Sequence, residues 1–308
     1  MPWKHWSAER LGIAFAVLAA LGFSFKAIFV KLAYAVPQPV PVDAVTLLAL
    51  RMVFSLPVFV WVGFASSRNA APLSRRDWLY LTALGLLGYY GASILDFIGL
   101  RYITAGLERL ILFTYPTLTI LIGVLFMGKT ASRREMGALA LSYGGIGLAF
   151  AHDLHLAGDV KVVLLGAAFV LGSSLCYAFY QAGSEPVIRQ LGAARFTALA
   201  LLVSTLATLL HFGVTQPMQA LAQPLPVYGY GAAMALFSTV LPVFMSSAAI
   251  RRIGAAKSVL IGTLGPVLTI FFGWWLLDEA LSLAQLAGAS LVLAGVLLAS
   301  RPQVAARR

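Results

Sequence analysis

The sequence predicts an all-α, polytopic membrane protein whose ten transmembrane helices form two inverted five-helix repeats. Of the 308 residues, 60% are hydrophobic and only 11% are charged. A soluble chain of this size would be about half apolar and a quarter charged. So few charged side chains cannot cover a water-exposed surface, which excludes a soluble enzyme, a disordered chain and a coiled coil. A bilayer span needs about 20 apolar residues, so the chain has room for about ten spans.

Ten long apolar segments satisfy this length rule, and their continuous rather than alternating hydrophobicity argues against membrane strands. They are expected at residues 11–34, 44–65, 78–100, 104–127, 134–151, 160–188, 194–214, 227–250, 255–277 and 283–300. Proline, glycine and charged residues separate them, as at residues 37–41, 68–76 and 216–226.

Basic residues gather on one side of the predicted bundle. With the N-terminus in the cytoplasm, the inner side carries Lys4, Arg10, Arg68, Arg75, Arg76, Lys129, Arg133, Arg134, Arg189, Arg195, Arg251, Arg252, Arg301, Arg307 and Arg308. The outer side carries only Arg101 and Lys161. Because cytoplasmic loops are enriched in lysine and arginine, this asymmetry predicts an inner-membrane protein with both termini cytoplasmic. Topology, rather than a nucleic-acid partner, then explains the net charge of +11.

The second half of the sequence repeats the first at an offset of 150 residues. Leu110-Ile111 matches Leu260-Ile261, Pro116 matches Pro266, Leu118-Thr119-Ile120 matches Leu268-Thr269-Ile270, and Gly145 matches Gly295. The two repeats are expected at residues 1–152 and 158–308, with five spans each. Because five is odd, the second copy enters the membrane from the opposite side. Inverted repeats of this kind are a common plan of secondary transporters.

These features together resemble the EamA family of the drug/metabolite transporter superfamily over nearly the whole chain. They are the two five-span halves, a proline in the middle of spans four and nine, Asp278-Glu279 closing span nine, and a glycine-rich last span. The sequence departs from the family in one place, because Gly128-Lys129 stands where a Gly-Glu pair often follows span four. The glutamate survives only as Glu279, and we assign this motif no coupling role.

The resemblance implies transport of a small metabolite, with export as the expected direction. It also implies a cavity walled by spans one, three, four, six, eight and nine, with spans five and ten as a scaffold. Glycines recurring in those two spans predict that they pair with each other or with a second chain. The expected partners are a small-molecule substrate and the lipid bilayer, with protons as a candidate coupling ion and either a monomer or a homodimer as the assembly.

Five charged residues of the first half are expected at one level of the membrane, toward the outer side: Lys26, Arg51, Asp96, Glu108 and Arg109. Charges inside a bilayer are costly, so they pair with each other or line a wet cavity. Two interpretations stay open, namely structural ion pairs that lock the first half, and a substrate-binding or gating cluster. Three cations against two acids favour a substrate with a carboxylate, such as an amino acid. Asp96 and Glu108 are the candidates for proton coupling.

Polar and aromatic side chains of the second half supply further candidates. Tyr177, Tyr180 and Gln181 follow one another along span six, and Lys257 is expected to pair with Glu185. The alternative for the two tyrosines is that they are ordinary core residues that only pack against neighbouring helices.

Two prolines predict matched helix breaks near the membrane midplane. Pro116 and Pro266 each remove one backbone hydrogen bond, which leaves the carbonyls of Leu112 and Gly262 in need of a partner. Matched interruptions in two inverted halves indicate a binding site at that level, with Tyr115 as one liner. The alternative is that both prolines only bend their helices for packing.

Enzyme chemistry finds little support in the sequence. No metalloprotease, nucleophile-elbow or phosphate-loop motif occurs, and the His152-x-x-His155 pair lies in a predicted outer loop. We therefore expect no cofactor, no metal and no catalytic residue. A polytopic membrane enzyme and a non-transporting membrane scaffold are the alternatives to a transporter.

Overall fold

The computed structural model describes residues 8–37, 42–128, 133–156 and 159–300, and within these ranges all regular structure is helical. The elements are α1 (Ala8–Tyr34), α2 (Ala44–Ser67), α3 (Arg75–Gly85), π-helix η2 (Leu86–Gly91), α4 (Ala92–Gly99), α5 (Ala105–Leu112), α6 (Tyr115–Met127), α7 (Arg133–Leu156), α8 (Val160–Leu191), α9 (Ala193–Thr215), 3₁₀-helix η3 (Met218–Leu221), α10 (Leu225–Ala235), π-helix η4 (Leu236–Val240), α11 (Leu241–Gly262), α12 (Leu264–Leu277) and α13 (Leu283–Ser300).

Seven helical segments of the described chain are long and apolar enough to cross a membrane. They begin at Ala8, Ala44, Arg75, Ala105, Val160, Ala193 and Leu225, close to the expected starts of seven spans. The other three expected spans form shorter apolar helices at Met136–Ala151, Leu264–Leu277 and Leu283–Leu298. The all-helical, polytopic architecture is therefore confirmed, while the count of ten membrane crossings stays a prediction.

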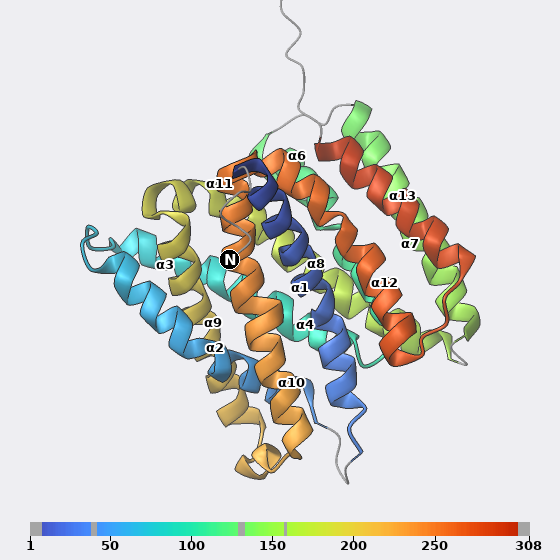
Figure 1. Ribbon diagram of the computed structural model, residues 1–308, viewed down its shortest axis with the longest axis horizontal. Coiled ribbons are helices and arrows are strands. Elements are labelled where there is room, and N and C mark those ends of the chain that lie inside the picture. Colours follow the sequence, from blue (N-terminus) through green and yellow to red (C-terminus); the bar gives the residue numbers. More distant parts are fainter. Residues whose placement is uncertain (1–7, 38–41, 129–132, 157–158, 301–308) are drawn as a thin grey trace, which may run out of the picture.

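The helices form one bundle, with different sets of helices on its two sides (Figure 1). Helices α7 and α13 lie side by side at one edge, and α2, α3 and α9 make the other. Helix α1 runs between them and packs against α11 and α12. Spans distant in the sequence are thus neighbours, and residues of both halves meet along α1.

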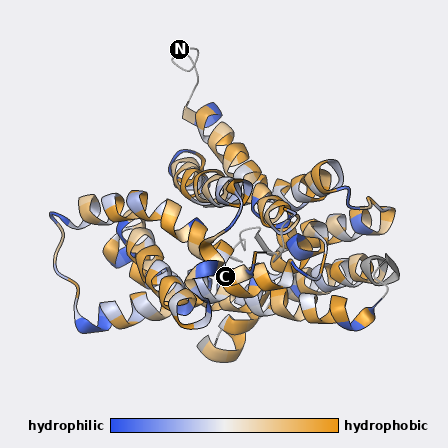
Figure 2. Ribbon diagram, turned by 90° about the horizontal axis from the view of Figure 1, so that it is seen from below, coloured by the Kyte–Doolittle hydropathy of each residue, from blue (hydrophilic) through white to orange (hydrophobic). Residues whose placement is uncertain are grey.

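Hydrophobic residues make up most of the length of the helices, and hydrophilic residues lie mainly toward helix ends and loops (Figure 2). Trp61 and Phe64 on α2 are each 69% exposed, and Phe126 on α6 is 72% exposed. Exposing so many large apolar groups to water is unfavourable, whereas contact with lipid tails removes them from water. The surface is that of a multi-pass membrane protein.

Helices α7 and α13 pack closely because small residues line their contact. A side-chain carbon added to Gly145, Gly288 or Gly295 would collide with the backbone of the facing helix. By contrast, Gly144 faces open space. The expected pairing of spans five and ten with each other is confirmed, and the close approach is the one that small residues permit.

Irregular backbone occurs at matching places in the two halves. The π-helices η2 and η4 begin at Leu86 and Leu236, which are 150 residues apart. Breaks precede α6 at Thr114 and α12 at Thr263, and left-handed residues end these helices at Gly128 and Asp278. The π-helices and the left-handed helix ends thus share the 150-residue offset of the sequence repeat, and the breaks match it to within one residue.

Polar contacts bring several predicted inner loops to one end of the bundle. The guanidinium of Arg195, at the start of α9, donates to Ser67 Oγ at 3.2 Å and to the Ala71 carbonyl at 3.0 Å. At the same end Gln190 donates to Asp77. The expected pair between Lys257 and Glu185 is wrong, because Glu185 pairs with Arg189 and Lys257 with Glu9. Both actual partners lie nearer, one turn away on the same helix or on the adjacent α1.

Candidate functional site

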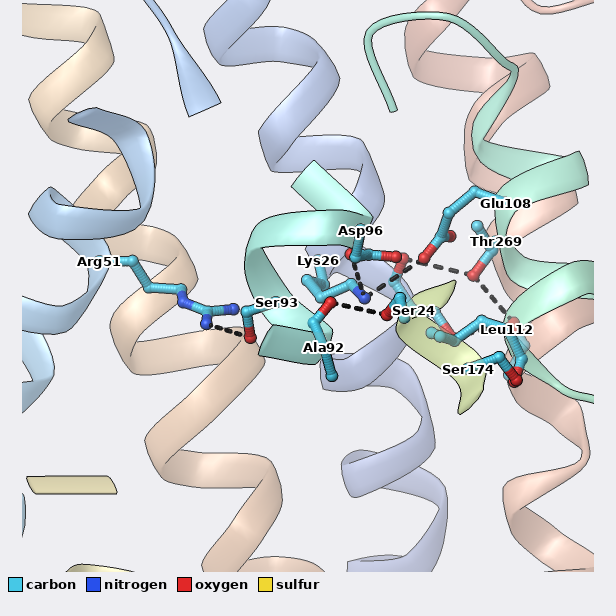
Figure 3. A network of polar contacts seen from close by, with 12 residues as sticks. Ser24, Lys26, Arg51, Ala92, Ser93, Asp96, Glu108, Leu112, Ser174 and Thr269 are labelled. Atoms are coloured by element: carbon cyan, nitrogen blue, oxygen red, sulfur yellow. Dashed lines mark hydrogen bonds and ion pairs between the residues drawn. The ribbon is translucent and has the colours of Figure 1, made fainter. Parts of the chain in front are cut away.

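The centre of the candidate site is an ion triad made by three helices. Lys26 on α1 places its Nζ 2.7 Å from Asp96 Oδ2 on α4 and 3.3 Å from Glu108 Oε1 on α5. Asp96 is 1% exposed and Glu108 is fully buried. Figure 3 shows the lysine reaching between the two carboxylates. The structure thus brings together three of the five charges that the sequence placed at one level.

Capping contacts position the start of α5, the helix that carries Glu108. Thr104 caps the N-terminus of α5 by accepting from the Leu107 amide, which begins the helix just before Glu108. The carboxylate of Glu279, from the other half of the chain, accepts from the Ala105 amide at 2.9 Å. Carboxylates are stabilising at helix N-termini because of the helix dipole. Glu279 also lies 3.9 Å from Lys31 on α1, so it links the end of α12 to the first half.

The triad holds one acidic group more than its lysine can neutralise. Two carboxyl groups contact a single ammonium, and both are shielded from solvent. Arg51 and Arg109 also act electrostatically on Asp96 and Glu108, so the lysine is not the only positive charge that offsets these two buried acids.

Arg51 lies beside the triad and extends its guanidinium toward Ser93 on α4, without an ion pair to either carboxylate (Figure 3). Its Nη2 donates to Ser93 Oγ at 2.8 Å, and its guanidinium carbon lies 4.9 Å from the centre of the Phe97 ring. Only 6% of the residue is exposed. Arg51 thus ties α2 to α4 through a hydrogen bond and a cation–π contact, and among the described residues it has no ion pair.

Arg109 is buried where α5 meets the beginning of α12. It is 8% exposed, and its guanidinium carbon lies 5.2 Å from the centre of the Phe113 ring. A Cβ on Gly265 would lie only 3.0 Å from Arg109 Nη2, so the glycine makes room for the guanidinium. Arg109 Nε has no hydrogen-bond partner in the described part of the chain. A buried cation with an unused donor can take an anionic ligand.

A cluster of aromatic rings extends from this region along α8. Tyr115 packs edge-to-face on Tyr177 at 4.8 Å between ring centres, and Tyr177 stacks on Tyr180 at 5.4 Å. The hydroxyl groups of Tyr180 and Tyr89 lie 2.9 Å apart. Three of these tyrosines were candidates from the sequence, whereas Gln181 exposes its side chain away from the cluster.

Sequence reasoning missed Tyr89, which lies on the π-helix η2. Nothing in the residues around Tyr89 distinguishes a π-helix from an α-helix. Two tyrosines between glycines in an apolar span, Gly88-Tyr89-Tyr90-Gly91, were a sign of Tyr89 itself but not of the π-helix. π-bulges are rare and are frequent at functional sites, which makes Tyr89 a further candidate.

Both proline breaks adjoin the ion triad and the aromatic cluster. Ser174 on α8 donates to the Leu112 carbonyl at 3.1 Å, the group that Pro116 leaves without its helical partner. In the second half, Ser24 on α1 donates to the Gly265 carbonyl at 3.0 Å, one residue before Pro266. The sequence predicted that the Leu112 carbonyl needs a partner, and the Ser174 hydroxyl fills this role (Figure 3). At the second break the hydroxyl contact is made to Gly265 and not to Gly262, the carbonyl that Pro266 was predicted to leave free.

Metal binding finds no support in the described residues, where no group of three or more histidine, cysteine, aspartate or glutamate side chains could hold an ion. Lys129 lies outside the described residues, as do the side chains of His152 and His155. The chemistry of the site is that of carboxylates, an ammonium, guanidinium groups and aromatic rings.

A polytopic helical bundle with buried charges beside paired helix breaks is the architecture of a membrane transporter. The chain belongs to the EamA-like transporter family, whose model matches residues 10–151 and 164–301. The resemblance drawn from the sequence is thereby confirmed.

Relatives agree with this assignment. The chain is 32% identical over 291 residues to the uncharacterized transporter YcbK of Bacillus subtilis (strain 168), covering 90% of this chain and 88% of that protein. It is 25% identical over 233 residues to the uncharacterized transporter YyaM of the same organism, covering 73% and 74%. A solved crystal structure shares the fold with a TM-score of 0.64 at 17% identity, covering 94% of this chain and 96% of that one.

Proposed function

We propose that this protein is a secondary transporter that moves a small carboxylate-bearing metabolite, such as an amino acid, across the inner membrane by alternating access. Residues 1–152 and 158–308 form two inverted repeats, and both termini lie in the cytoplasm. Export is the proposed direction on the strength of the family alone. The observation that carries the substrate class is Arg109, a buried guanidinium with an unused donor at a helix break.

Helix geometry supports a carboxylate at this position. Helix α12 begins at Leu264 with no side-chain cap, and Gly265 in its first turn lies against Arg109. The N-terminus of a helix carries a partial positive charge. Broken helices in transporters direct such ends at anionic groups of their substrates. A substrate carboxylate between Arg109 and the start of α12 would meet both charges at once.

Aromatic side chains would hold the rest of the substrate. Tyr115 follows the break beside Arg109, and Tyr177 and Tyr180 continue from it along α8. Aromatic rings offer apolar faces together with polar hydroxyl groups, a combination common in small-molecule sites. Gln181 would meet the substrate only outside this cluster, because its side chain is exposed.

The ion triad would couple transport to proton movement. Asp96 and Glu108 belong to different helices, and Lys26 belongs to a third, so rearrangement of α1, α4 and α5 would change which groups touch. A proton taken up by one carboxyl group would weaken the hold on Lys26, and its release would restore that hold. Arg51 would brace α2 against α4 during this change, and Pro116 and Pro266 would mark the bending points.

Flux measurements in reconstituted vesicles test the proposal. A panel of labelled amino acids, organic acids, nucleosides and the amines that correspond to the amino acids would be offered to the protein. We expect uptake or exchange of a carboxylate-bearing compound, with its decarboxylated amine at least about tenfold poorer because a charge-assisted pair is lost. Equal transport of acid and amine would contradict the carboxylate site.

Variants locate the site within the chain. Arg109→Gln should lower flux of the carboxylate at least about tenfold. Arg189→Gln, which removes a 79% exposed side chain paired on the surface with Glu185, is the matched control and should keep normal flux. A protein that folds, shows no flux for any compound and instead modifies one of them would support the enzyme alternative.

A further inference from the structure

We propose that a groove between α2, α9 and α11 binds one anionic phospholipid of the inner leaflet. The groove has a volume of about 230 Å³ and is separate from the ion triad. Phe59 and Val62 of α2 form one wall, and the first turns of α9 form another. This volume lies below the range of about 300–1,000 Å³ that is common for small-molecule sites, so a slender occupant fits best.

The lining changes character along α11 from apolar to charged. Val243, Phe244, Ser247 and Arg251 follow one another along one face of this helix. At 1.5 Å per residue, Val243 and Arg251 are about 12 Å apart along the axis. An occupant of the whole groove must therefore be apolar at one end and complementary to a guanidinium at the other, which describes an acyl chain with an anionic headgroup.

Arg251 is available for such a headgroup. It is exposed, and no described residue forms an ion pair with it. Its neighbour Arg252 is instead engaged, because it donates to the Ala248 carbonyl and lies 5.1 Å from the centre of the Phe15 ring. Ala193 and Ala194, at the start of α9, line the same groove. That helix start has no side-chain cap, so its partial positive charge adds to the arginine.

The position of the groove agrees with a lipid site. Ala194 of its lining directly precedes Arg195, whose guanidinium donates to the Ala71 carbonyl at the end of the bundle where predicted inner loops meet. Phe244 is 39% exposed and Ala194 is exposed, so the groove opens to the outside of the bundle. Basic pockets between membrane helices on the cytoplasmic side bind anionic headgroups. Only the assignment to the inner leaflet depends on the proposed topology.

Native mass spectrometry of the full chain in detergent, titrated with palmitoyl-oleoyl phosphatidylglycerol or phosphatidylcholine, tests the proposal. We expect the wild type to bind phosphatidylglycerol more tightly than phosphatidylcholine. Arg251→Gln should weaken phosphatidylglycerol binding about fivefold without changing phosphatidylcholine binding, since one basic group near a headgroup contributes about this factor. Arg251→Lys should restore most of the preference, and the matched control Arg252→Gln should leave it unchanged.

A second variant tests the groove rather than the charge. Ala194→Trp should fill the mouth and weaken binding of both lipids while Arg251 stays in place. Equal effects of Arg251→Gln and Arg252→Gln would overturn the proposal in favour of diffuse surface charge. Displacement of bound phosphatidylglycerol by a transported carboxylate would also overturn it, because the groove would then be part of the substrate path. Flux lost in Arg109→Gln bears on the proposed function and not on this site.

Discussion

Replacing Lys26 by methionine should destabilise the protein more than any exposed lysine substitution would. The change removes an ammonium group that lies 2.7 Å from Asp96 and 3.3 Å from Glu108, and leaves both carboxyl groups buried. Removing one partner of a buried ion pair costs about 3–5 kcal/mol. The Lys26 side chain is 17% exposed, so the pair is not fully buried, and we expect the free energy of unfolding to fall by an amount toward the lower end of that range.

Unfolding by titration with a denaturing detergent, followed by tryptophan fluorescence, measures this loss. Lys257→Met is the matched control, because its Nζ also lies 2.7 Å from a carboxylate but both groups are about 60% exposed, and it should change stability little. The double variant Lys26→Met/Asp96→Asn should regain at least about 1 kcal/mol of the loss, since residues in contact couple. A Lys26→Met protein within about 0.5 kcal/mol of wild type would refute the reasoning.

Two further predictions concern helix breaks and helix contacts. Ser174→Ala should lower the free energy of unfolding by about 1–3 kcal/mol, because it leaves the Leu112 carbonyl without a partner. The effect should be smaller in a Pro116→Ala background, where the amide of residue 116 can donate to that carbonyl. A double-mutant cycle that shows no coupling between the two positions would contradict this. Gly145→Val should lower the free energy of unfolding by about 1–3 kcal/mol, because the added side chain separates α7 from α13. Gly144→Val is the control and should leave stability unchanged, because Gly144 faces open space. Thermal unfolding of the two variants measures the difference.

The sequence predicted most of the helices because bilayer burial depends on length and hydropathy, which are properties of the chain itself. The start of α2 at Ala44 and of α8 at Val160 coincide with expected span starts at residues 44 and 160. The π-helices at Leu86 and Leu236 were not predicted. Whether a turn forms π-helical instead of α-helical backbone hydrogen bonds depends on how neighbouring helices pack, and no residue type signals it.

The sequence predicts a common membrane level for these charged residues, and that level stays a prediction, but the direction of each side chain could not be predicted. Lys26, Asp96 and Glu108 face one another. Arg51 faces Ser93, because the rotation of α2 is set by its packing against α9 and α10. The same reason explains why Lys257 finds Glu9 instead of Glu185.

Labelling of single cysteines tests most directly whether the two halves are inverted copies. Ala71 lies in the loop before α3, and its carbonyl contacts Arg195 at the start of α9. Helix α9 is 23 residues long, and Ala222 lies beyond its other end. In a Cys176→Ala chain, a membrane-impermeant maleimide should label Ala222→Cys in intact cells and Ala71→Cys only after permeabilisation. Labelling of both positions from the same side of the membrane would contradict the account.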